Sequence, residues 1–179
     1  MTYPWSSGDV LTAADLNAYA GLVLVKTQTI GSGVSSVTVT NAFSSTFDNY
    51  RIIHHGGTAS AFSNVEMTLG ATATGYYWAQ CFVNYSTSAV SGSSGANVAH
   101  WRVGSVQSSP NMNFVNVDVF SPNLAIETAI SINPRSSGGV AGSGAGYLFD
   151  QTAYTSFTFT FPTGTATGGT IRVYGYNNG

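Results

Sequence analysis

The most constraining feature of this chain is a two-residue period of apolar and polar side chains that recurs in short segments beyond Gly21. Its clearest example is residues 157–161, where three phenylalanines alternate with two threonines. Successive side chains of a β-strand point to opposite faces, so this pattern predicts strands with one buried face. Residues 78–85 are apolar on both faces, as in a central strand. The other predicted strands are residues 22–30, 36–40, 50–55, 65–69, 99–106, 114–120, 126–132, 147–150 and 170–176.

The segments are separated by Gly, Ser, Asn and Pro, which are the residues typical of turns. They predict an all-β fold, an antiparallel β-sandwich or jelly roll of about ten strands. No segment repeats at a fixed period, which argues against a propeller or solenoid. Two stretches rich in Ser and Gly, residues 86–97 and 134–146, are predicted to be long loops at the ends of the sandwich. Such loops are either adaptable contact surfaces or mobile connections without a role.

Residues 4–20 are the one stretch that predicts a helix. Thr12 is a good N-cap with Asp15 three residues later, and Leu11 and Leu16 have the spacing of a hydrophobic staple. A helix of about two turns does not persist in water unless another surface packs on it. We therefore predict a docking segment, residues 1–21, followed by a β-domain, residues 22–179. Its docking side chains would be Trp5, Val10, Leu11, Leu16 and Tyr19. The alternative is a helix that closes one end of its own sandwich.

Charged residues are scarce. Asp, Glu, Lys and Arg make up 7% of the chain, against about a quarter in typical soluble domains. With five Lys and Arg and a net charge of −2, the chain lacks the basic patch that nucleic acids or anionic membranes require. A weakly charged surface suits a protein that is covered in an assembly or that recognises neutral ligands such as glycans. The longest aliphatic run, residues 22–25, is too short to span a membrane.

The sequence offers no persuasive catalytic or metal-binding pattern. Cys81 is the single cysteine, so an intrachain disulfide is excluded. His54 and His55 are neighbours on a predicted strand and point to opposite faces, so they are expected at the core or its rim and not on one metal. Asp118 and Glu127 could in principle form the carboxylate pair of a hydrolase, but nothing around them suggests a cleft. We expect no enzyme activity, no metal site and no cofactor.

Three aromatic residues are candidates for contact with a neutral glycan or host surface: Tyr76, Tyr77 and Trp101. Aromatic faces beside hydroxyl groups stack well on sugar rings. Most aromatic side chains of a β-sandwich belong to its core, however, so a structural role is the alternative for each. If the glycan hypothesis holds, the chain would be a carbohydrate-binding module.

Residues 5–17, with the sequence WSSGDVLTAADLN, resemble the N-terminal segment of tail-fibre and minor tail proteins of tailed bacteriophages. Residues 47–52 and 169–176 also resemble stretches of β-rich virion surface proteins of these phages. The resemblance implies a virion protein, assembled in the host cytoplasm, whose N-terminal segment attaches to other virion proteins. It further implies a homotrimeric β-domain that meets the host surface.

The chain departs from that family in two respects. It has no fibrous shaft repeat, and the catalytic residues of depolymerase tailspikes have no counterpart in it. The resemblance therefore implies a compact adaptor or tail-tip protein, with a head-decorating (cement) protein as the alternative.

Overall fold

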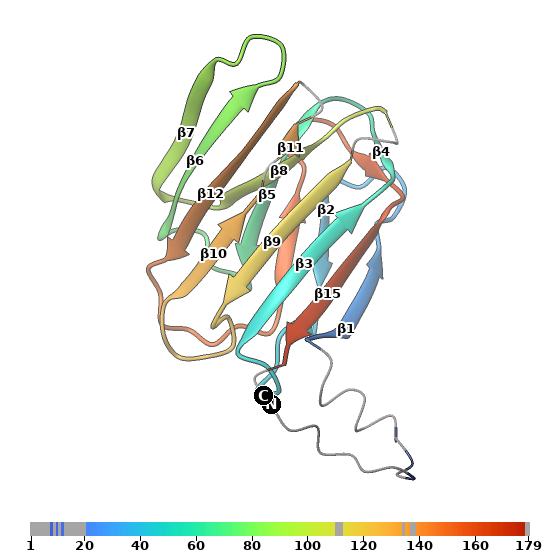
Figure 1. The fold of residues 1–179 in the computed structure, drawn as a ribbon, viewed down its shortest axis with the longest axis vertical. Coiled ribbons are helices and arrows are strands. Elements are labelled where there is room, and N and C mark those ends of the chain that lie inside the picture. Colours follow the sequence, from blue (N-terminus) through green and yellow to red (C-terminus); the bar gives the residue numbers. More distant parts are fainter. Residues whose placement is uncertain are drawn as a thin grey trace.

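The computed structural model describes residues 8, 10, 12, 21–109, 113–133, 135–136 and 139–177. All regular structure in these residues is β (Figure 1). Thirteen strands form one hydrogen-bonded sheet, and two short strands form a second one. The predictions of an all-β chain and of antiparallel pairing are confirmed. The stretch predicted to hold a helix, residues 4–20, lies outside the described residues, except for Gly8, Val10 and Thr12.

The strands are β1 (Leu22–Thr29), β2 (Ser36–Val39), β3 (Asn49–His55), β4 (Thr58–Ala59), β5 (Ser63–Leu69), β6 (Tyr76–Asn84), β7 (Val90–Val98), β8 (Trp101–Val106), β9 (Phe114–Phe120), β10 (Thr128–Ile132), β11 (Arg135–Ser136), β12 (Val140–Leu148), β13 (Phe157–Thr160), β14 (Ala166–Thr167) and β15 (Thr170–Tyr176).

The large sheet is arranged in two layers. One layer follows the order β1-β15-β3-β9-β10-β12-β6-β7, and the other follows the order β2-β13-β5-β8. The two layers are connected through β8 and β9, which pair at Ser105 and Phe114. Figure 1 shows the first layer in front of the second. The apolar side chains of the two layers meet between them and form the core.

Strands β3, β5 and β9 bury every second side chain, as a two-residue period requires. Aromatic side chains fill much of the space between the layers, among them Phe157 and Phe159 of β13, both with no exposed surface. The connection before β3 also contributes, because Phe43 packs edge-on against Tyr50 at 4.9 Å between ring centroids. These apolar segments were recognisable from the sequence pattern alone.

The prediction of long loops at residues 86–97 and 134–146 is wrong. Most of the first stretch is β7, and most of the second is β12. The reason is the close approach of β12 to β6. A Cβ atom on Gly144 would lie 2.6 Å from the Ala79 carbonyl oxygen, and one on Gly146 would lie 2.5 Å from the Tyr77 carbonyl oxygen. Glycine is present here because no side chain fits, although glycine disfavours strands intrinsically.

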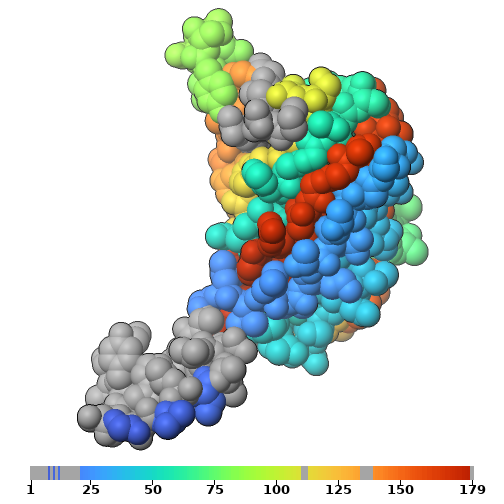
Figure 2. Space-filling model, turned by 90° about the vertical axis from the view of Figure 1, so that its right-hand side faces the viewer, coloured from blue at the N-terminus to red at the C-terminus, as the bar shows by residue number. Residues whose placement is uncertain are grey.

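The two ends of the β-domain lie together. Leu22, the first residue of β1, pairs with Tyr176, the last residue of β15. Figures 1 and 2 place this pair of ends towards one end of the molecule, and the turn of the β6–β7 hairpin projects at the other. Residues 1–20 therefore join the β-domain far from the hairpin tip.

Replacing Gly144 by alanine tests the close approach of the two strands. The added methyl group would also meet Gln80 Cγ at 2.7 Å, so we expect the free energy of unfolding to fall by about 1–3 kcal/mol. Gly21→Ala is the matched control, since a Cβ atom there has no neighbour within 4 Å. Thermal and urea unfolding of both variants measure the difference. Equal stability of the two variants would contradict the role assigned to Gly144.

Candidate functional site

The outer face of β6 and β12 is the most distinctive surface of the described chain. Tyr77 lies opposite Tyr147, Ala79 opposite Ala145 and Cys81 opposite Ser143. The intervening residues point inward, as the fully buried Leu148 shows. Small side chains therefore form a flat surface, and the two tyrosines protrude from it at one end.

The two tyrosines form a wall beside a shallow depression. Their rings are stacked with centroids 4.9 Å apart and an interplanar angle of 3°. The depression has a volume of about 420 Å³. Its lining residues are Tyr77, Trp78, Ala79, Gly95, Ala145, Gly146 and Tyr147.

No charged side chain lines this depression. The sequence has no Asp, Glu, Lys or Arg between Glu66 and Arg102, a span that includes all of β6 and β7. An exposed apolar side chain, Val83 at 42% exposure, lies further along the outer face of β6. A site of aromatic and small apolar groups with few polar ones suits the face of a neutral ring, such as a sugar, or an apolar protein side chain.

The structure separates the three aromatic residues that were predicted to contact a glycan. Tyr77 lines the depression, whereas Tyr76 and Trp101 have no exposed surface. The prediction is wrong for these two, because they point inward and pack edge-on with 4.9 Å between centroids. Their polar atoms are paired: the Tyr76 hydroxyl accepts from the Leu69 N–H at 2.8 Å, and the Trp101 indole N–H donates to the Tyr147 carbonyl oxygen at 3.3 Å.

Tyr147 was missed as a site residue. The alternation of glycine in residues 142–146 continues directly into Tyr147 and Leu148, and this period was the available signal. Because glycine disfavours strands, the composition of this stretch predicts a loop and hides the period. Trp101 supports Tyr147 from the inner side of the sheet through the indole hydrogen bond, so the buried residue still helps to position the exposed one.

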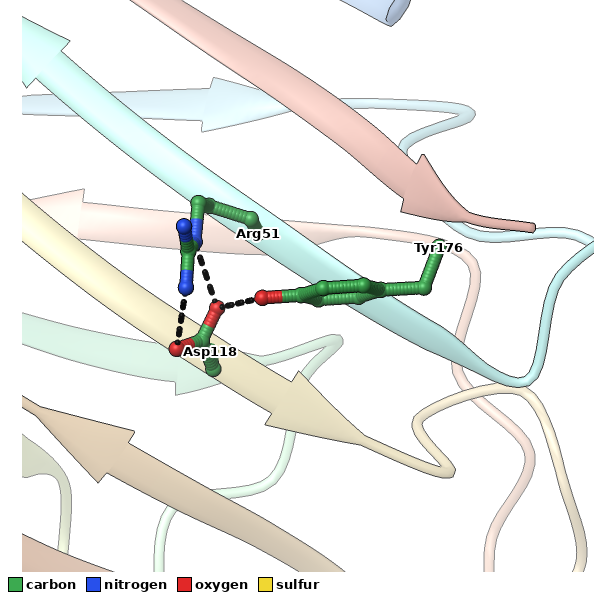
Figure 3. Close-up of polar contacts among 3 residues, drawn as sticks. All are labelled: Arg51, Asp118 and Tyr176. Atoms are coloured by element: carbon green, nitrogen blue, oxygen red, sulfur yellow. Dashed lines mark hydrogen bonds and ion pairs between the residues drawn. The ribbon is translucent and has the colours of Figure 1, made fainter. Parts of the chain in front are cut away.

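A cluster of polar side chains lies elsewhere on the same layer. It forms where Arg51 of β3, Asp118 of β9 and Tyr176 of β15 meet (Figure 3). Arg51 Nε donates to one carboxylate oxygen of Asp118 at 2.7 Å, and its Nη2 donates to the other at 2.9 Å. The Tyr176 hydroxyl donates to the first oxygen at 2.5 Å. The Arg51 guanidinium also lies 5.6 Å from the centre of the Tyr176 ring.

The charged groups of this cluster pair with one another. Burial alone would raise the pKa of Asp118, but the hydrogen bonds from Arg51 and Tyr176 prevail and lower it. Burial and the hydrogen bond to Asp118 raise the pKa of Tyr176 to about 12. A carboxylate held ionised and a phenol held protonated have no acid–base role near neutral pH. The cluster is a clamp across three strands at the end of the domain where residues 1–20 join it.

Asp118 and Glu127 do not form a catalytic pair. Asp118 lies opposite Ser131 of β10, and Glu127 precedes that strand by one residue. Four residues along a strand correspond to about 13 Å, more than the separation used by glycosidases. Glu127 instead lines a smaller depression of about 250 Å³ with Phe149, Asp150 and Gln151.

His54 and His55 point to opposite faces, as predicted. His55 is exposed, whereas His54 is 1% exposed and neither of its ring nitrogens has a hydrogen-bond partner. Burial lowers the pKa of His54 to about 4, against a smaller opposing effect of the Gly56 backbone and with a still smaller lowering by His55. His54 is therefore a neutral core residue. Within the described residues, no three His, Cys, Asp or Glu side chains are grouped as a metal would require.

Four of the five predicted docking residues, namely Trp5, Leu11, Leu16 and Tyr19, lie outside the described residues. The fifth, Val10, is 86% exposed. No helix among the described residues has the length and apolar character needed to cross a membrane.

Comparison of the chain with models of known protein families finds no match, and a search of curated proteins finds none that is similar.

The buried His54 predicts a specific acid sensitivity. Its pKa is about 4 in the folded chain and about 6.5 when unfolded, so the unfolded state binds the proton first as the pH falls. Stability should be complete above about pH 6.5 and should fall by about 3 kcal/mol as the pH is lowered to 4. His54→Leu should remove this loss, because leucine binds no proton.

Urea unfolding at several pH values between 4 and 7.5 measures the effect. His55→Gln is the matched control, since His55 is exposed and contributes only a small part of the shift of His54, so most of the slope should remain. A His54→Leu protein with the same slope as the parent would show that the acid sensitivity has another origin.

Proposed function

We propose that this chain is a structural protein of a bacteriophage virion, in which residues 1–21 attach it to other virion proteins and the β-domain faces outward. The observation that carries the proposal is the difference between the two ends of the domain. Leu22 and Tyr176 meet at one end, and the charge-free β6–β7 hairpin projects at the other (Figures 1 and 2). A tether at one end leaves the opposite end free for contacts.

Two further features support this proposal. Residues 5–17 resemble the particle-attachment segment of tail-fibre and minor tail proteins. The Arg51–Asp118–Tyr176 clamp holds three strands together next to the point where that segment enters. A domain that is held through one short segment benefits from a well-connected end, because forces on the tether act on those strands first.

The finer assignments belong to the same proposal. The two layers and their closely packed core favour a β-sandwich of the jelly-roll kind. The scarcity of charge favours a domain that is partly covered by its neighbours, for which we propose a homotrimer. A tail-fibre or tail-tip adaptor is the preferred position in the virion, and a head-decorating protein is the alternative.

Truncation tests the attachment. A chain that begins at Gly21 retains every described strand, so we expect it to fold but to be lost from assembled particles. Leu16→Asp in the full chain should have the same effect, because a carboxylate cannot remain in an apolar docking contact. Quantitative mass spectrometry of purified particles gives the readout, and circular dichroism of the free proteins shows that the fold is retained. Normal incorporation of both variants would refute the docking role.

The depression beside Tyr77 and Tyr147 supports a second role, contact with a neutral glycan of the host surface. Its stacked rings and uncharged lining fit the apolar face of a sugar. A carbohydrate-binding module that acts without a virion would use the same surface. Several copies of the domain in one particle would turn a weak contact into a strong one.

The glycan role predicts that Tyr147→Ala and Tyr77→Ala each weaken binding about fivefold, since loss of one aromatic stacking contact is worth about 1 kcal/mol. Tyr85→Ala is the control, because Tyr85 is 60% exposed but does not line the depression. A glycan array followed by titration calorimetry on any positive glycan provides the measurement. Absence of saturable binding by the parent protein, or equal binding by all three variants, would exclude this role.

A further inference from the structure

The last strand of the front layer, β7, has one unpaired edge. In the described part of the chain β7 pairs only with β6 and terminates the order of strands. It is nine residues long, so its free edge presents a row of backbone donors and acceptors. Such an edge accepts another strand unless the chain protects it.

Two other terminal strands of the large sheet, β1 and β2, are protected in the described part of the chain. Strand β1 carries Lys26 in its middle and has an irregular register between Leu24 and Lys26. Strand β2 has four residues and is too short to template much pairing. A central lysine, a bulge and a short length are the usual means of blocking edge-to-edge association.

Strand β7 has little of this protection. It contains no charged residue and no proline, and residues 91–96 are all Ser, Gly or Ala. Its one irregularity lies near its end, opposite Tyr76 to Trp78, where Asn97 has a φ of 53°. Val90–Gly95 keeps a regular register with β6.

From this contrast we propose that the free edge of β7 pairs, antiparallel, with the β7 edge of a second copy of this chain. Identical edges meet without like-charge repulsion only when they are uncharged, which β7 is and β1 is not. Antiparallel pairing about a two-fold axis continues one sheet across both copies, with both outer faces on the same side. Ser94, the exposed middle residue of β7, then lies near the axis.

The neighbouring surface favours the same occupant. Val90 at one end of β7 is 69% exposed, and Val83 beside it on β6 is 42% exposed. In the paired arrangement Val90 lies beside the far end of the other copy's β7, which lowers its exposure to water. The contact is independent of residues 1–21, so it would join two chains, or two of the proposed trimers, through their projecting ends.

Charge placed at Ser94 tests the pairing in the full chain. Light scattering and sedimentation of the parent protein should give an even multiple of the 18.6 kDa chain mass. Ser94→Lys and Ser94→Asp should each halve that mass, since like charges then face each other across the axis. An equimolar mixture of the two variants should restore it, because opposite charges then meet. Thr29→Lys, on the exposed face of β1, is the matched control and should keep the parent mass.

Hydrogen exchange of the parent protein provides a test that needs no variant. Amide protection of Val90–Gly95 should rise with protein concentration if two copies pair there. A parent mass that is an odd multiple of the chain mass, a mass unaffected by Ser94→Lys, or concentration-independent exchange would each overturn the proposal. Capture of a strand from another protein in place of a second copy would overturn it as well. Incorporation into particles through residues 1–21 should not change in Ser94→Lys, so the two proposals fail separately.

Discussion

The approach of β12 to β6 is the constraint on which the candidate contact surface depends. Glycine on β12 leaves room for the backbone and side chains of β6, and any Cβ atom at Gly144 or Gly146 would collide with a carbonyl oxygen. This approach places Tyr147 against Tyr77 with parallel rings. It also brings Ala79 and Ala145 side by side, so that the surface next to the tyrosines carries only small side chains. Glycine disfavours strands intrinsically, so β12 must be stabilised by its hydrogen bonds to the strands on both sides of it, β10 and β6.

Charged residues are distributed unevenly along the domain. At the end where residues 1–20 enter, Arg51, Asp118 and Tyr176 satisfy one another and tie β3, β9 and β15 together. Towards the hairpin, charged residues are absent from β6 and β7. The first end is therefore suited to holding the domain together, and the second to meeting a neutral surface without an electrostatic cost. The free edge of the uncharged strand β7 is consistent with this division.

The success and the failure of the sequence predictions have the same cause. Segments such as residues 157–161 alternate between aromatic and hydroxyl side chains, and the burial of alternate residues in β13 follows that pattern directly. In β12 the inward positions hold glycine and not apolar side chains, because the partner strand leaves no room for them. The two-residue period is still present there, as alternating glycines, but it does not resemble the usual pattern of a strand. Strand geometry alone predicted that His54 and His55 point to opposite faces, whereas the burial of His54, Tyr76 and Trp101 required knowing which face of each strand turns inward.

By itself, the amino-acid sequence determined the all-β class, the position of most strands and the scarcity of charge, because each of these is a property of local composition and period. The tertiary structure alone decided that Arg51 meets Asp118 and that Tyr77 meets Tyr147, because each pair joins strands far apart along the chain and depends on strand order and register. It likewise decided which strand edges stay open, since an edge exists only once every other strand has found its partner.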